Sequence, residues 1–175
     1  MAYRFSLVTP YLIGITLLVL SSCTCETEES AYELNEADRG FMTNLYGYNE
    51  YKLQAASLAI ENGKTATQTL ASDIEQDLEL TRNRLKTIAA NTHYTLPDAI
   101  PADAATQLSA LIATSPETFD IHYVQSQLTQ VAADIALLEK ELEEGTEPSV
   151  MALTQEYLPV LQLHKAWLEE LLDTL

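Results

Sequence analysis

The side chains that could do chemistry in this chain are few, because its 175 residues include only three histidines and two cysteines. A di-iron site in a helical bundle requires Glu-x-x-His pairs, since two metal ions need carboxylate and imidazole donors at fixed heights. The residues three positions before the histidines are Ala90, Phe119 and Leu161, so the sequence contains no such pair. The Gly-x-Ser-x-Gly, Cys-x-x-Cys, His-Glu-x-x-His and phosphate-loop patterns are also missing. We therefore expect a protein that is not an enzyme.

The amino-terminal segment carries a more specific chemical signal. A basic start at residues 1–4 precedes a mostly apolar run over residues 7–20. This run is too short for a membrane span of about 20 residues but fits the hydrophobic region of a signal peptide. The tetrapeptide LSSC that ends at Cys23 then resembles the lipobox of bacterial lipoproteins. That resemblance implies a signal peptide over residues 1–22, cleavage before Cys23 and lipidation of its sulfur. The alternative is an uncleaved amino-terminal anchor.

The residues after Cys23 bear on location and redox chemistry. Thr24 stands where an aspartate would resemble the inner-membrane retention signal of enteric lipoproteins, so we expect an outer-membrane protein that is periplasmic or surface-exposed. Cys25 has no later cysteine to pair with, which excludes an internal disulfide framework and leaves an idle thiol or an intermolecular disulfide. Residues 23–34 contain four glutamates, a composition typical of a solvated, acidic tether.

The chain is strongly acidic, with a formal net charge of −17 at pH 7. Such a surface repels nucleic-acid phosphates and anionic lipid headgroups, so we expect no nucleic-acid partner. Attached acyl chains would still hold the protein at a membrane, because each buried methylene contributes about 0.8 kcal/mol. The expected partners are therefore the membrane, through the amino-terminal lipid, and a protein of the cell envelope.

Start and stop signals divide residues 35–175 into four long helices and one short helix. Glycine and proline are scarce, at 5 and 6 residues, which favours helices over a turn-rich β fold. Asn35 is a cap for the first helix and Gly63 its stop, whereas Ser115 precedes a proline as the cap of the third long helix. The expected segments are a helix over 35–62, a helix from 65, a linker over 92–104, a short helix over 105–113, a helix from 115 that ends before 145, and a helix that starts within 146–148.

Helical periodicity also assigns faces to particular side chains. The third long helix has an almost unbroken apolar stripe at steps of three and four residues, which predicts its inward face. The stripe consists of Val124, Leu128, Val131, Ile135, Leu138 and Leu142. Basic residues gather late in the second helix, where we expect them to complement the dipole of its C-terminal end. They are Arg82, Arg84 and Lys86.

Three short strings follow one another in a distinctive order along this domain. They are Thr95-Leu96-Pro97 in the linker, Phe119-Asp120 with Tyr123 at the third long helix, and Leu158-Pro159 followed by His164 in the fourth. Together they resemble a ferritin-like domain of unknown function in exported bacterial outer-membrane proteins, over about residues 38–174. The resemblance implies an all-α fold: an antiparallel four-helix bundle of ferritin-like type, with the short extra helix between the second and third long helices.

The same resemblance bears on metal binding. That family tends to carry a glutamate in the first helix, Asp-His in the second, and one histidine in each of the last two. Glu50, Asp77 and His164 match this pattern, but both middle histidines are replaced, by Leu78 and Val131. The resemblance thus implies either a weakened site in which the three matching residues hold one divalent metal ion, or no cofactor. Without a metal, His164 is a core residue hydrogen-bonded to Asp77 or to a tyrosine hydroxyl.

The sequence as a whole predicts a signal peptide over 1–22, an acidic tether over 23–34 and a helical bundle over 35–175. It favours a lipid-anchored envelope protein whose bundle is non-catalytic and has a binding or structural role. A metal-handling protein with a mononuclear divalent site is the alternative.

Overall fold

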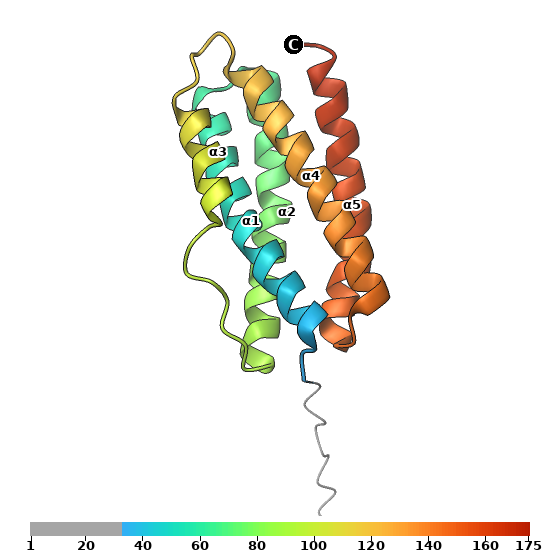
Figure 1. Cartoon of the computed structure of the whole chain (residues 1–175). Coiled ribbons are helices and arrows are strands. Elements are labelled where there is room, and N and C mark those ends of the chain that lie inside the picture. Colours follow the sequence, from blue (N-terminus) through green and yellow to red (C-terminus); the bar gives the residue numbers. More distant parts are fainter. Residues whose placement is uncertain (1–32) are drawn as a thin grey trace, which may run out of the picture. The chain divides into compact units, whose positions relative to one another are not determined.

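The computed structural model describes residues 33–175, which form an all-helical bundle with no β-strand in that range. The expected signal peptide over 1–22, the lipidation site Cys23 and nearly all of the tether lie outside the described residues. Of the helices in this part of the chain, none is both long and apolar enough to cross a bilayer. The helices are α1 (Glu36–Asn62), α2 (Thr65–Asn91), α3 (Ala102–Ile112), α4 (Phe119–Glu144) and α5 (Pro148–Leu172) (Figure 1).

Capping residues fix the ends of α1 and the start of α5 where the sequence predicts them. Asp38 donates its backbone N–H to Asn35 Oδ1 at 2.7 Å, and the Asp38 carboxylate accepts the Asn35 N–H at 2.8 Å. This reciprocal capping box satisfies two backbone donors at the first turn of α1. Gly63 follows the last residue of α1, as expected for a helix stop. Glu147 caps α5 by accepting the Val150 N–H at 2.7 Å.

Two helix starts differ from the sequence prediction. α3 begins at Ala102, earlier than expected, directly after Pro101. The missing N–H of Pro101 breaks no helical hydrogen bond there, because N–H groups at a helix start have no acceptor within the helix. α4 begins at Phe119 and not at Ser115. The reason is a tight turn in which Thr118 donates its N–H to the Ser115 carbonyl at 3.1 Å, so that the preceding residues do not enter the helix.

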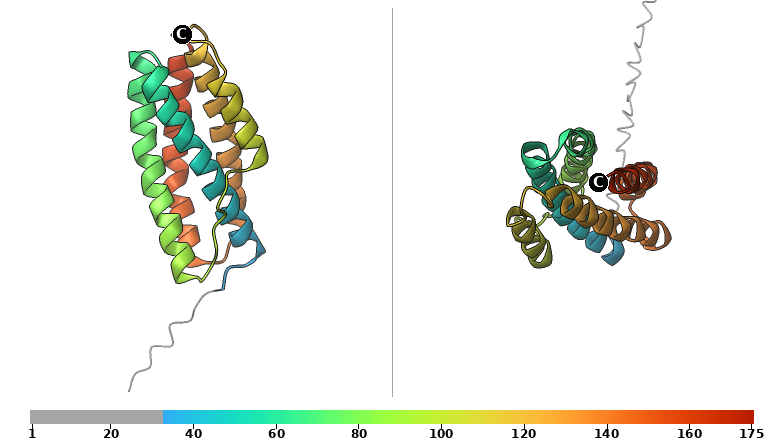
Figure 2. Two further views of the ribbon diagram at one scale, coloured as in Figure 1. Left: turned by 90° about the vertical axis from the view of Figure 1, so that its left-hand side faces the viewer. Right: turned by 90° about the horizontal axis from the view of Figure 1, so that it is seen from above.

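The four long helices each pack against two others. α1 contacts α2 and α4, and α5 contacts the same two helices from the other side. The segment after α2 runs back along the bundle to α3, which packs on α1 and α4 (Figure 2). Gly47 permits this approach, because a Cβ atom there would lie 3.0 Å from the Pro101 ring.

The inward face of α4 is rotated relative to the predicted apolar stripe. Half of the stripe is buried as expected, namely Val124, Val131 and Leu138. The other half is only partly buried, namely Leu128, Ile135 and Leu142. The inward positions belong to polar residues one place earlier and seven residues apart, namely Asp120, Gln127, Asp134 and Glu141. Residues three and four apart share a helix face, so the polar residues lie on the same inward face as Val124, Val131 and Leu138. A stripe assigned from apolar residues alone is therefore displaced by one residue from the inward face that the structure shows.

Two leucines of α4 test this rotation with the same substitution. Leu138 is fully buried, at 0% exposed, whereas Leu142 is half-buried. We expect Leu138→Ala to lower the free energy of unfolding by about 3 kcal/mol and Leu142→Ala by about 1 kcal/mol, because only the first leaves a cavity in the core. Urea denaturation of both variants measures the difference. Equal losses would mean that the apolar stripe, and not the polar column, faces inward.

Candidate functional site

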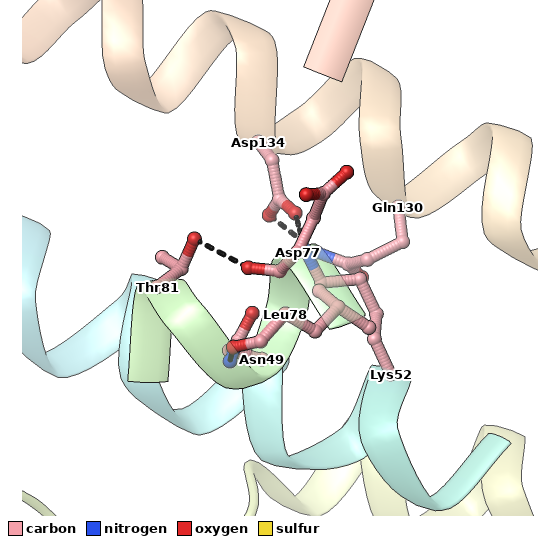
Figure 3. A network of polar contacts seen from close by, with 7 residues as sticks. All are labelled: Asn49, Lys52, Asp77, Leu78, Thr81, Gln130 and Asp134. Carbon is pink, nitrogen blue, oxygen red and sulfur yellow. Dashed lines mark hydrogen bonds and ion pairs between the residues drawn. The ribbon is translucent and has the colours of Figure 1, made fainter. Parts of the chain in front are cut away.

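A buried ion pair joins α1 to α4 in the interior of the bundle. The Lys52 ammonium on α1 contacts the Asp134 carboxylate on α4, and their side chains are 1% and 2% exposed. Gln130, one turn before Asp134, donates from its side-chain amide to the second carboxylate oxygen at 3.0 Å (Figure 3). Both oxygens of Asp134 are therefore occupied by side chains of the protein itself.

Burial and charge act in opposite directions on Lys52. Burial alone would lower the pKa of its ammonium, but the Asp134 carboxylate and the Tyr157 hydroxyl together outweigh this effect and raise the pKa. The Tyr157 ring on α5 adds a cation-π contact, since the Lys52 nitrogen lies 5.9 Å from the ring centroid. Burial raises the pKa of the Tyr157 hydroxyl, which therefore stays protonated. The site holds one positive and one negative charge and is internally neutral.

Further polar groups extend this layer toward α2. The Asn49 side-chain amide on α1 donates to the Leu78 carbonyl at 2.8 Å, and the Thr81 hydroxyl donates to the Asp77 carbonyl at 2.9 Å (Figure 3). Within the described part of the chain, the Asn49 side-chain oxygen meets no donor. These side chains thus add hydrogen bonds to backbone carbonyls of α2, one from α1 and one from within α2 itself.

The structure brings together two of the three metal-ligand candidates. His164 Nε2 lies 2.9 Å from Asp77 Oδ2, and the histidine is 1% exposed while the aspartate is 37% exposed. Burial lowers the pKa of His164 although Asp77 opposes the shift, so the imidazole is neutral at pH 7. The hydrogen bond between these residues is the one expected for a core histidine. The Trp167 ring lies beside it, with 5.8 Å between ring centroids.

Glu50 lies apart from that pair. Its carboxylate is 27% exposed and lies 3.8 Å from the Arg82 guanidinium of α2. Among residues 33–175, no group of three or more histidine, cysteine, aspartate or glutamate side chains is arranged to hold a metal ion. The three matching residues therefore do not converge on one point.

The basic residues of α2 tie helices together, and the prediction that they serve the helix dipole was wrong. None of them lies in the last turn of α2. Arg82 pairs with Glu79 of its own helix and approaches α1, Arg84 pairs with Glu156 of α5, and the Lys86 nitrogen lies 5.9 Å from the Tyr46 ring centroid.

A second polar contact closes the end of the bundle where α1 begins. Asp38 accepts the Thr146 N–H at 3.1 Å and the Glu147 N–H at 3.3 Å, which ties the start of α1 to the loop before α5. Burial works against the charge on Asp38, but the backbone N–H groups, that of Asn35 foremost, lower its pKa. Burial and the neighbouring Asp38 raise the pKa of Glu141 to about 8, so this carboxyl is protonated at neutral pH.

Sequence reasoning missed both residues of the central ion pair, although a signal was present. Asp134 belongs to a column of polar residues on α4 at steps of seven. Lys52 stands seven residues after Leu45 and seven before Ala59, both fully buried. A charged residue at an inward heptad position on each of these two helices would have indicated charges that meet in the core.

The fold and the site define an all-helical bundle whose interior contains an ion pair with no net charge. The chain belongs to the family described as "Domain of unknown function (DUF4142)", which matches residues 23–171. The crystal structure of a DUF305 fragment from Deinococcus radiodurans has the same fold, with a TM-score of 0.74 and 13% sequence identity. The likeness covers 82% of this chain and 99% of that one. No curated protein matches the chain.

A double-mutant cycle tests the central ion pair. Lys52→Met or Asp134→Leu alone leaves one buried charge unpaired, so we expect each to lower the free energy of unfolding by about 3 to 5 kcal/mol. The double variant removes both charges and should recover to within about 2 kcal/mol of the parent. Urea unfolding of the four proteins gives the coupling energy. Additive losses would show that the two groups do not depend on each other.

Proposed function

We propose that this chain is a lipid-anchored protein of the bacterial cell envelope, held at the outer membrane and periplasmic or surface-exposed. The support lies in the basic start, the apolar run and the tetrapeptide that ends at Cys23. The family match begins at that same residue, as expected if the mature chain starts there. The strongly negative charge argues against a nucleic-acid partner, so the lipid and a protein of the envelope are the proposed partners.

The bundle is proposed to be an antiparallel four-helix bundle of ferritin-like type. Its connectivity supports this class, because the chain leaves α2 at one end of the bundle and enters α4 at the other (Figure 1). The intervening connection contains α3 and joins two hairpins, α1 with α2 and α4 with α5. A long crossover between two hairpins is the feature that separates ferritin-like bundles from simple up-and-down bundles.

The bundle is proposed to bind or to support a partner and not to catalyse a reaction. The observation that supports this proposal is the Lys52–Asp134 ion pair, in which a lysine of the protein neutralises the buried carboxylate. A metal ion or a reactive group in a bundle core requires inward side chains whose donor atoms or charges are not already paired within the protein. The other buried aspartates are also engaged: Asp38 in a cap, and Asp120 by accepting the Lys64 N–H at 2.9 Å.

The two cysteines near the amino terminus test the anchor, and one of them serves as the control. We expect Cys23→Ala to block processing and to leave an unacylated precursor, because the acyl chains attach to that sulfur. Cys25→Ala should be processed and acylated like the parent. Intact-mass spectrometry of membrane fractions measures both outcomes. An unacylated mature chain from the parent sequence would refute the lipid anchor.

Metal analysis tests the non-catalytic, metal-free core. After metal-free purification and reconstitution with iron, manganese or zinc, we expect less than one equivalent of bound ion, because Glu50 stays away from the Asp77–His164 pair. His164→Ala should leave the bound amount unchanged. Stoichiometric metal in the parent that disappears in His164→Ala would favour metal handling instead.

A further inference from the structure

Two hollows follow one another along the seam between α2 and α5. The first has a volume of about 460 Å³ and lies between Leu70 and Asp73 of α2 and Trp167 of α5. The second, of about 250 Å³, lies between Asp77 of α2 and Tyr157 of α5, among other residues. Asp73 lines the first hollow and Asp77 the second, so along α2 the second hollow begins one helical turn after the first. We call the two hollows together the α2–α5 groove. A hollow of about 430 Å³ also lies between α1 and α4, but no exposed large hydrophobic residue of the described range lines it.

Exposed apolar side chains mark this groove. Three large hydrophobic residues stand out in the described part of the chain: Leu80 at 65% exposed, Ile112 at 63% and Leu163 at 47%. Leu80 lines the second hollow together with Val160. Leu163 follows Val160 by three residues and precedes Trp167 by four, so it lies on the same face of α5. Two of the three exposed hydrophobic residues therefore border the groove, while Ile112 is the last residue of α3.

The charges at the groove are mostly negative. Asp73 and Glu170 border the first hollow, and Asp77 and Glu156 border the second. The one cation that lines either hollow is Arg84, whose guanidinium already pairs with Glu156. The neutral His164 beneath Asp77 adds no positive charge. The α2–α5 groove, with apolar residues in its lining and acidic residues at its border, is complementary to a ligand that has an apolar face and a basic border.

We propose that the α2–α5 groove docks an amphipathic helix of another protein, with its apolar face in the hollows and its lysine or arginine residues toward the four carboxylates. Helix-in-groove binding of this kind uses apolar anchors at spacings of three, four and seven residues. A second copy of this chain is disfavoured as the occupant, because each copy carries a net charge of −17. The inference rests on the binding role proposed above and is independent of the lipid anchor.

Trp167 provides the readout, since it is the only tryptophan of the chain and lines the groove. The probe is a synthetic peptide of about 18 leucine and lysine residues, arranged so that leucines occupy one helix face. Its titration into the full chain, at one fixed concentration of nonionic detergent, should give a saturable change in Trp167 fluorescence at one peptide per chain. A peptide of the same composition with scrambled order should bind at least about tenfold more weakly, because it presents no apolar face.

Variants at the exposed hydrophobic residues test where the peptide binds. Leu80→Gln and Leu163→Gln keep the net charge and should each weaken binding by about tenfold, since each removes one leucine contact. Ile112→Gln makes the same kind of change outside the groove and should leave binding unchanged. Equal effects of all three variants, or equal binding of the scrambled peptide, would overturn the inference. So would self-association of the parent chain in sedimentation that Leu163→Gln abolishes, because the occupant would then be a second copy.

The experiments can refute the groove proposal and the lipid-anchor proposal independently of each other. Acylation of Cys23 together with no specific peptide binding would reject the groove and leave the anchor standing. Specific peptide binding by a chain that carries no acyl group would reject the anchor and leave the groove standing.

Discussion

A lysine ammonium buried between helices must meet an opposite charge, and this requirement fixes how α1 and α4 face each other. An unpaired buried ion would cost several kcal/mol, so Lys52 and Asp134 stabilise only an arrangement that brings them together. Two other polar contacts repeat the constraint at the ends of the helices. Asp38 binds the loop between α4 and α5, and Asp120 accepts the backbone N–H of Lys64. Sliding or rotation of α4 would break these contacts together.

The buried ion pair and the α2–α5 groove lie at different seams of the bundle. The inward column of α4 faces α1, and α3 packs across these two helices. Hollows also lie between α2 and α5, and these two helices carry the exposed leucines Leu80 and Leu163. The neutral Asp77–His164 pair lies beside Trp167 at this second seam. A neutral ion pair between α1 and α4 and an apolar groove with an acidic border between α2 and α5 are consistent with the binding role proposed above.

The sequence predicted the helices better than the interior. Asn35 and Gly63 act locally, as a cap and a stop that involve residues a few positions away, so they could be recognised without knowledge of the fold. The start of α5 within 146–148 was predicted in the same way. Helical spacing also placed His164 in the core, with Asp77 or a tyrosine hydroxyl as its expected partner, and the structure shows Asp77 in that role. Lys52 and Asp134 were missed although heptad spacing marks their inward positions, because a charged residue is ordinarily assigned to the surface and nothing local links two residues 82 positions apart.

The charge state of Lys52 decides whether the interior is held by an ion pair. The measurement is the ¹⁵N resonance of the Lys52 side-chain nitrogen by NMR across a pH titration, assigned with Lys52→Arg. A buried ammonium paired with Asp134 should keep its proton to a higher pH than an ordinary lysine, because its pKa is raised. A neutral amine at pH 7 would contradict the ion pair, and with it the fixed facing of α1 and α4.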